Sequence, residues 1–132
     1  MENGSHKVEI KVRYAETDAM RFVYYGNYFT YFEVARIAAL EDLGYPYHKM
    51  EENRILIPVL SASAEFKRPS FFGDVLTIHT SKQRIGNTRV QFTYKVFCRE
   101  NLIATGTTRH AFMNPDGKPI RPPEDIIRLF DQ

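Results

Sequence analysis

The sequence predicts an α+β domain in which an antiparallel sheet packs against one long helix. Three patterns indicate this class: an alternating segment near the N-terminus, a broad apolar helical stripe after it, and four later strand patterns joined by short turns. The chain has 132 residues, of which 43% are hydrophobic. That length supports a single domain, residues 1–132, with one core of ordinary size.

The first strand and the helix are predicted by two different periodicities. Residues 8–12 alternate apolar and charged side chains, which is typical of a strand with one face in water. Further on, apolar residues recur at steps of three and four and predict a helix over residues 27–44. We expect Asn27 to cap this helix, and Gly44 followed by Pro46 to end it.

The second half of the chain is predicted to be rich in strands. Gly86-Asn87 and Glu100-Asn101 indicate tight hairpins between successive strands, and Pro58 is expected at a strand start, edge or bulge. Residues 122–125 open a short C-terminal helix. The strand patterns cover residues 55–67, 75–85, 90–99 and 102–113.

A helix this apolar needs more cover than a surface helix does, so we expect the sheet to wrap around it. One such sheet still has an open edge, which pairing with a second copy would bury. The sequence therefore predicts a homodimer or homotetramer.

Composition excludes several classes of partner. With 18 basic and 16 acidic residues the net charge is +2, so neither duplex nucleic acid nor an anionic membrane is expected as the main partner. The single cysteine, Cys98, permits no intrachain disulfide. We expect it to pack as a small buried apolar side chain. The four histidines lack metal-ligand spacing, so no metal is predicted.

The expected location is the cytoplasm. The N-terminal residues lack the apolar stretch of a signal peptide, and no segment has the length and apolarity of a membrane span. Residues 1–6 are small and polar, and we expect them to form a flexible lead-in.

Asp18 is the main candidate for chemistry because it precedes the predicted helix. A helix start offers unpaired N–H groups and a partial positive charge, which attract a developing oxyanion. A neighbouring carboxylate can act as a base or a nucleophile. The alternative is that Asp18 only closes a turn.

Four sequence segments resemble those of the 4-hydroxybenzoyl-CoA thioesterase-like hotdog-fold family, which includes the YbgC-type acyl-CoA thioesterases. They are YAETDAM at residues 14–20, VYYGNY at 23–28, YFEVAR at 31–36 and RPSFFGD at 68–74. The resemblance extends over roughly residues 8–114. It implies a hotdog fold, an antiparallel sheet wrapped around one long central helix, and hydrolysis of an acyl-CoA thioester.

The resemblance also implies roles for individual residues. Asp18 matches the catalytic carboxylate, and the backbone N–H of Tyr25 matches the group that polarises the thioester carbonyl. No cofactor is implied, since coenzyme A is part of the substrate. Asp18 could attack the carbonyl or deprotonate water, and the sequence leaves both routes open.

The chain departs from the family pattern at two positions. Arg21 stands where the family commonly has glycine, and Tyr25 where histidine is another common choice. Because the proposed role at position 25 belongs to the backbone N–H, a tyrosine there is compatible with it. Arg21 could reshape the pocket mouth, pair with Asp18 or Glu16, alter the acyl preference or weaken activity.

Other site residues are predicted from composition and position. Tyr25, Tyr28 and Phe32 are expected to contact a small to medium or aromatic acyl group. Glu33, on the helix, is the reserve catalytic carboxylate, because another hotdog branch uses a helical glutamate.

Basic residues near two turns are candidates for holding the phosphates of coenzyme A. They are Arg84, Arg89, Lys118 and Arg121. Two rival functions stay open: a thioesterase acting on an acyl carrier protein, and a non-catalytic acyl-binding protein.

Overall fold

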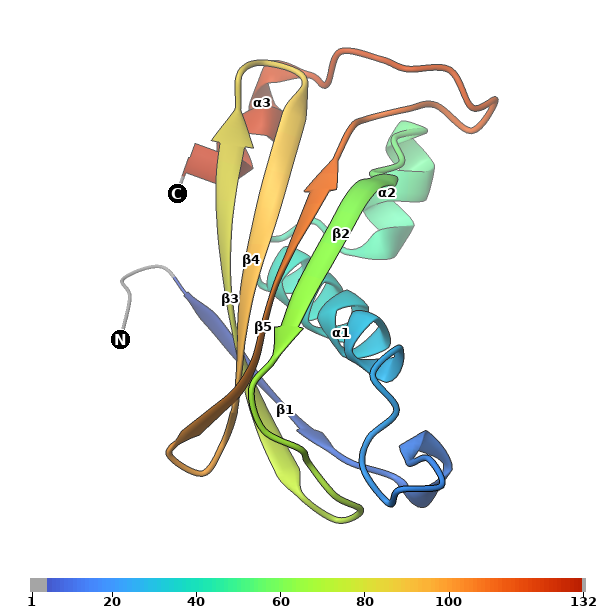
Figure 1. Ribbon diagram of the computed structural model, residues 1–132. Coiled ribbons are helices and arrows are strands. Elements are labelled where there is room, and N and C mark those ends of the chain that lie inside the picture. The colour runs from blue at the N-terminus through green and yellow to red at the C-terminus, as the bar shows by residue number, and fades with distance from the viewer. Residues whose placement is uncertain (1–4, 132) are drawn as a thin grey trace.

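The computed structural model describes residues 5–131 and shows one five-stranded antiparallel sheet (Figure 1). The strand order is β1-β3-β4-β5-β2, so β1 and β2 form the two edges. The fold is therefore α+β, as predicted. The strands are β1 His6–Lys11, β2 Val59–Phe66, β3 Val75–Ile85, β4 Arg89–Cys98 and β5 Asn101–His110.

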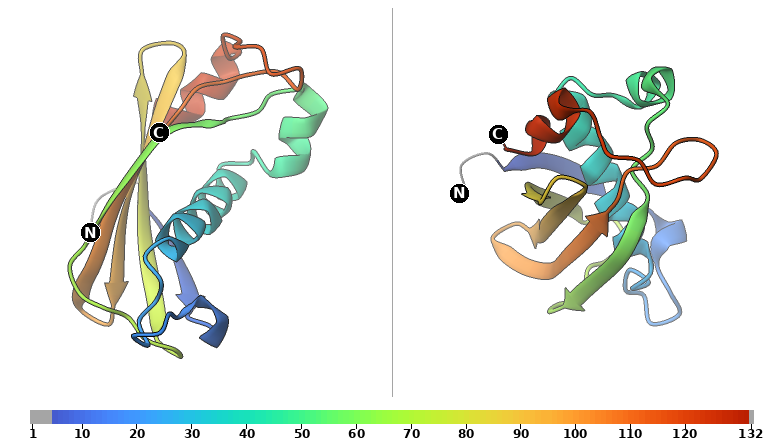
Figure 2. Two further views of the ribbon diagram at one scale, coloured as in Figure 1. Left: turned by 45° about the vertical axis from the view of Figure 1, so that its right-hand side comes forward. Right: turned by 90° about the horizontal axis from the view of Figure 1, so that it is seen from above.

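The helix α1, Asn27–Asp42, lies across one face of the sheet, and no helix of residues 5–131 lies on the opposite face (Figure 2). Its buried side packs on the sheet through large side chains, and the Phe32 ring stacks on Tyr94 with ring centroids 4.4 Å apart. A short 3-10 turn precedes it at Tyr14–Glu16. The helix α2, Tyr47–Asn53, follows, and the chain ends in α3, Glu124–Ile127, and a 3-10 turn, Arg128–Asp131.

The predicted strands and helices all occur in the predicted order, with boundaries that differ by a few residues and with one additional helix, α2. Asn27 does not cap α1, however: Gly26 occupies the cap position, and the Asn27 side chain instead donates to the Glu16 carbonyl at 2.8 Å. The helix α2 was not predicted, because Met50 is its one buried residue and its pattern carries no apolar stripe.

The expected lead-in falls partly outside the described residues, which begin at residue 5. His6 belongs to β1, where it pairs with Thr80 in register, and its Nε2 lies 2.8 Å from the Asp42 carboxylate. Strand β1 therefore includes His6, a residue that we expected in the lead-in. No helix within residues 5–131 combines the length and apolarity needed to cross a membrane.

A chain of hydrogen bonds runs through the core between α1 and the sheet. Arg36 Nη1 donates to the Tyr94 hydroxyl at 3.1 Å, which lies 2.7 Å from Thr108 Oγ1. His110 Nε2 lies 2.8 Å from the same Oγ1, and its Nδ1 lies 3.3 Å from the Ile57 carbonyl. All these groups are satisfied when His110 is neutral and donates from Nδ1. Protonation of Nε2 would reverse the chain and leave the Tyr94 O–H without an acceptor.

Acid is expected to destabilise the fold through His110. Burial, with the nearby charge of Arg36, lowers the pKa of His110 to about 4. As pH falls from about 6.5 towards 4, the unfolded chain takes up a proton that the native state refuses, so the free energy of unfolding decreases. The loss should reach about 2 kcal/mol at pH 4.5. Urea unfolding at pH 7 and pH 4.5 measures it, and His110→Gln should show a correspondingly smaller acid effect. Equal acid effects in both proteins would contradict this role.

Candidate active site

Asp18 lies near the start of α1 because residues 16–24 fold back as a tight hairpin. Thr17 and Val23 form an antiparallel bridge, and the Tyr24 N–H donates to the Glu16 carbonyl at 2.9 Å. Helix α1 begins three residues after Tyr24. The carboxylate thus comes close to the helix start through a hairpin, although nine positions separate Asp18 from Asn27.

The hairpin turn is closed by Asp18 itself. Its N–H donates to the Phe22 carbonyl at 2.8 Å, and its Oδ1 accepts the N–H groups of Met20 at 2.9 Å and Phe22 at 3.3 Å. Asp18 therefore does close a turn, which was the alternative reading. Both of these side-chain bonds go to Oδ1, so within the described chain Oδ2 is left for another partner.

The start of α1 presents backbone N–H groups without acceptors. The N–H groups of Asn27 and Tyr28 are already used, because they donate to the carbonyls of Tyr24 and Tyr25. Those of Tyr25 and Gly26 find no acceptor within residues 5–131. Since these two groups lie at the positive end of the helix dipole, they are suited to hold an oxyanion.

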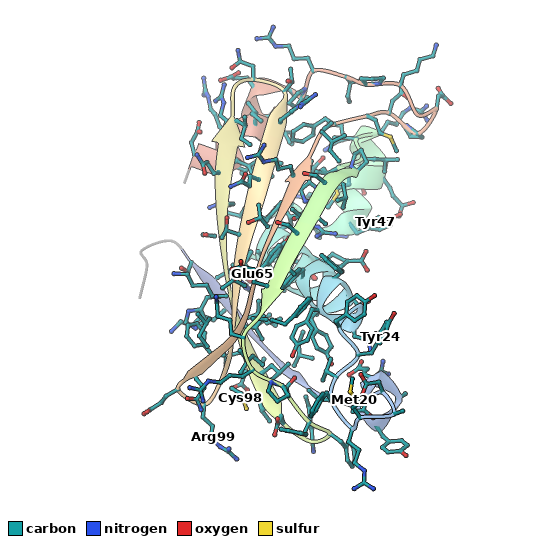
Figure 3. The ribbon with its side chains drawn as sticks, in the orientation of Figure 1. Met20, Tyr24, Tyr47, Glu65, Cys98 and Arg99 are labelled. Atoms are coloured by element: carbon teal, nitrogen blue, oxygen red, sulfur yellow. The ribbon has the colours of Figure 1, made fainter. Side chains whose placement is uncertain are left out.

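Asp18 and Tyr25 line the same cavity, which has a volume of about 380 Å³. Its wall combines apolar side chains with two basic residues that follow β2. Figure 3 shows Met20 and Tyr24 at this lower end of the molecule, where the hairpin meets α1. The lining residues are Asp18, Met20, Phe22, Val23, Tyr25, Tyr28, Phe66, Lys67, Arg68 and Pro69.

The three aromatic candidates have different positions. Tyr25 lines the cavity and is 59% exposed. Tyr28 also lines the cavity but is otherwise buried, and its hydroxyl forms a 2.7 Å hydrogen bond with Ser70 Oγ. Phe32 does not line the cavity: one turn further along α1, it is fully buried against Tyr94. We therefore place Phe32 in the core.

Glu16 holds the hairpin against the helix. One carboxylate oxygen accepts the Arg13 N–H at 2.9 Å and the Tyr31 hydroxyl at 3.0 Å, and the other lies 3.0 Å from Arg13 Nη2. Burial favours the neutral acid, but these bonds together hold the pKa of Glu16 below its ordinary value. Glu16 thus acts as a charged anchor, a role that its sequence motif did not disclose.

Arg21 adopts a left-handed backbone, with φ of 70°. It is the last residue of a hairpin loop of a type that needs such a conformation, which explains why glycine is common at this position in the family. Within the described residues no ion pair joins Arg21 to Asp18 or Glu16. Arg21 therefore preserves the loop shape that glycine would give.

Arg21→Gly is expected to keep the hairpin intact and to raise the free energy of unfolding by up to about 1 kcal/mol, because relief of left-handed strain outweighs the added chain entropy. Thermal unfolding measures this change. A loss of more than about 1 kcal/mol would show that the arginine side chain makes a stabilising contact of its own.

The predicted phosphate-binding residues do not line this cavity. The β3–β4 hairpin and the segment after β5 lie at the end of the sheet opposite the Asp18 hairpin (Figure 1). Arg84 is also engaged there, with hydrogen bonds to the Gly86 carbonyl, Asn87 and Asp131. Arg89, Lys118 and Arg121 are exposed.

Two other candidate chemistries find little support in the geometry. Across residues 5–131, His, Cys, Asp and Glu side chains form no group of three or more suited to a metal ion. Cys98 is half-buried, and burial together with the charge of Asp74 raises the pKa of its thiol. A raised pKa reduces the thiolate fraction that a nucleophile requires.

Comparisons with known proteins identify the family of this chain. The family model of the thioesterase-like superfamily matches residues 12–130. YneP of Bacillus subtilis, named provisionally as an acyl-CoA thioesterase, is 37% identical over 117 residues, covering 87% of this chain and 85% of YneP. A 1,4-dihydroxy-2-naphthoyl-CoA hydrolase of Nostoc punctiforme is 30% identical over 122 residues, covering 91% and 82%.

A solved structure supports membership of the same superfamily. The DHNA-CoA thioesterase from Staphylococcus aureus superposes with a TM-score of 0.85 at 35% identity, covering 89% of this chain and 80% of that one. Both the sequence match and the shape extend over nearly the whole described domain. The chain therefore belongs to the thioesterase-like superfamily.

Proposed function

We propose that this protein hydrolyses the thioester of a small to medium or aromatic acyl-CoA to the free acid and coenzyme A. One observation carries the proposal: Asp18 lines the same cavity as Tyr25, a residue at the helix start whose backbone N–H has no acceptor within residues 5–131. Asp18 supplies the base or nucleophile, and the Tyr25 N–H stabilises the oxyanion. The named activities of the relatives support the same reaction.

So sparse a site is sufficient for a thioester. A thiol has a pKa of about 8.5, so the thiolate leaves with little help from an acid, whereas an amine needs protonation. What remains is to deliver a nucleophile and to stabilise the tetrahedral oxyanion. Asp18 can do the first by attacking directly or by deprotonating water, and the helix start can do the second.

Aromatic acyl groups fit the cavity wall. Tyr28 and Phe66 have ring centroids 5.3 Å apart, and Tyr25 and Phe66 6.1 Å. These rings offer faces and edges for an aromatic or medium-length acyl chain. The 1,4-dihydroxy-2-naphthoyl group named for the Nostoc relative is of this kind.

Glu33 is a weaker candidate for the catalytic carboxylate. It is exposed, lies 4.0 Å from Arg36, and lines a different groove from Asp18. Among the described residues that line this groove, none offers an unpaired N–H group at a helix start. Asp18 is therefore the carboxylate that we assign to catalysis.

A second copy should complete the site. Within residues 5–131, β2 pairs with β5 on one side and with no strand on the other. Its large exposed apolar residues are Val59, Leu60 and Phe66. An unpaired apolar edge favours antiparallel pairing with the β2 of another copy. The joined sheets would then wrap around both α1 helices, as the hotdog architecture requires.

The two-fold axis of such a pair inverts the second sheet end for end. Val59 of one copy then lies near the Phe66 end of the other. Phe66 lines the Asp18 cavity, whereas Val59 lines the groove that contains Glu33. Each reaction cavity would thus be bounded by a surface of the second copy, and the protein would act as a dimer or a tetramer of dimers.

Leu60→Glu is expected to weaken dimerisation and to lower activity in parallel, because it places a charge on the β2 edge. Sedimentation equilibrium gives the association state, and thiol release gives the activity. Tyr47→Glu, at an exposed aromatic residue on α2, is the matched control. A monomeric protein with full activity would contradict the dimer.

Two alternatives make different predictions from the same site. A carrier-protein thioesterase would prefer an acyl carrier protein thioester to the matched acyl-CoA. An acyl-binding protein would bind both without turnover. Incubating the purified protein with a panel of acyl-CoA and matched carrier-protein thioesters, with detection of the released thiol, decides among the three. We expect turnover of acyl-CoA.

A further inference from the structure

The backbone carbonyl of Glu16 joins the Asp18 hairpin to the start of α1 through two hydrogen bonds. It accepts the Tyr24 N–H at 2.9 Å and the side-chain Nδ2 of Asn27 at 2.8 Å. Both lone pairs of this oxygen are therefore engaged. Since Glu16 precedes Asp18 by two residues, a single oxygen connects the arm of the hairpin that leads to Asp18 with the start of the helix.

These two bonds enclose the residues whose N–H groups have no acceptor within residues 5–131. Tyr24 directly precedes Tyr25, and Asn27 directly follows Gly26. The segment of Tyr25 and Gly26 is thus fastened at both ends to the same oxygen, while its own two N–H groups stay available. The position of these N–H groups relative to Asp18 therefore depends on both bonds.

Helix capping does not account for the Asn27 side chain. A capping side chain supplies an acceptor to the unpaired N–H groups of the first helical turn. The Asn27 amide instead donates from Nδ2 to a carbonyl that lies eleven positions earlier in the chain. It therefore ties two segments together and satisfies none of the N–H groups at the start of the helix.

Glu16 makes a second connection to α1, which offers an internal comparison. Its carboxylate accepts the Tyr31 hydroxyl at 3.0 Å, about one turn further along the helix than Asn27. This bond also holds the hairpin against α1, but it does not adjoin Tyr25 or Gly26. Loss of either bond should lower stability, whereas loss of the Asn27 amide alone should displace the free N–H groups.

We propose that Asn27 is a positioning residue for thioester hydrolysis: its amide holds the N–H groups of Tyr25 and Gly26 at the distance from Asp18 that the transition state requires. This inference rests on the proposed function, which it deepens. The carboxylate and the oxyanion donors act on the same acyl group, so their separation has to match the tetrahedral intermediate. Asn27 does not line the reaction cavity and acts through its neighbours.

The kinetics of two variants test the assignment. Asn27→Ala removes the amide, and Asn27→Ser keeps a polar side chain that is too short to reach the Glu16 carbonyl. Each should lower kcat for acyl-CoA about 10-fold and leave KM within about twofold, because the cavity wall is unchanged. Tyr31→Phe is the matched control: it should also lower the urea midpoint of unfolding, but it should keep kcat within about twofold.

Three kinetic results would overturn the inference. If kcat stays within about twofold of the parent in both Asn27 variants, the chemistry does not need the tie. An equal loss of kcat in Tyr31→Phe would show that activity merely follows stability. A change confined to KM would place Asn27 in substrate binding. Full activity in Asp18→Asn, by contrast, would overturn the catalytic site on which the inference rests.

Crystal structures of the parent and the variants test the geometry without turnover. The distance from the Tyr25 backbone nitrogen to the Asp18 carboxylate should change by roughly 0.5 Å or more in Asn27→Ala and stay unchanged in Tyr31→Phe. The same distance in all three proteins would overturn the inference. This comparison also separates the two proposals, since a parent that released no thiol from any acyl-CoA would contradict the proposed function and leave the distance test in force.

Discussion

Replacing Asp18 by asparagine is expected to lower kcat/KM for acyl-CoA hydrolysis at least about 100-fold, because both possible routes need the carboxylate. The substitution is well matched to the structure. Asparagine retains an oxygen that can accept the Met20 and Phe22 N–H groups, so the hairpin should survive. Only the charge, and with it the base or nucleophile, is removed.

The controls for this prediction separate chemistry from folding. Asp18→Asn should unfold at the same urea concentration as the parent, within error, whereas Asp18→Ala should lose about 1 kcal/mol along with the turn bonds. Glu33→Gln serves as the matched carboxylate control and should retain most of the activity. Unchanged turnover in Asp18→Asn, or a 100-fold loss in Glu33→Gln, would move the assignment to the other carboxylate.

The largest expected effect on stability comes from adding one methyl group at Gly106. This residue lies on β5 beneath α1, and a Cβ there would overlap the Phe32 ring and lie 3.1 Å from the Ser63 carbonyl oxygen. Phe32 has no room to retreat, since it is fully buried and stacked on Tyr94. Gly106→Ala should therefore lower the free energy of unfolding by about 2 kcal/mol, as overpacking of a dense core does.

A double-mutant cycle identifies the cause of that loss. Phe32→Leu alone leaves a cavity and should cost about 1 kcal/mol or more. Combined with Gly106→Ala, the smaller leucine makes room for the new methyl group. The double variant should therefore lose at least about 1 kcal/mol less free energy of unfolding than the two single variants lose together. Urea unfolding at one fixed protein concentration measures all four proteins. Strictly additive losses would show that the two residues do not press on each other.

The same cycle examines the role of Phe32. A core residue should affect stability while leaving kcat/KM of the folded enzyme within about threefold. A large change in KM in Phe32→Leu at unchanged stability would return this residue to the acyl-binding set.

The elements that the sequence predicted well are those whose periodicity reports burial directly. Helix α1 begins at Asn27, as expected, because its apolar stripe faces the sheet along its whole length. Strand β3 matches residues 75–85 because its side chains alternate between the core and the outer face. Helix α2 escaped prediction for the opposite reason, since it buries little and carries no stripe.

The candidate site was only partly predictable, because contacts between distant segments form it. Tyr28 and Phe32 are one turn apart on the same side of α1, yet one lines the cavity and the other fills the core. Nothing in the helical period distinguishes them. Phe66 and Arg68 reach the cavity only through the β2–β5 pairing, and no local motif reveals that. Glu16 was visible within its motif, but its bond to the Tyr31 hydroxyl was not.

A crystal structure of the Asp18→Asn variant with an acyl-CoA bound tests the central claim most directly. The account predicts an intact thioester whose carbonyl oxygen lies roughly 2.7–3.1 Å from the Tyr25 backbone nitrogen. The carbonyl carbon should lie roughly 3–3.5 Å from the side chain at position 18, or one water away from it. A thioester bound elsewhere, with its carbonyl directed away from the start of α1, would contradict the account.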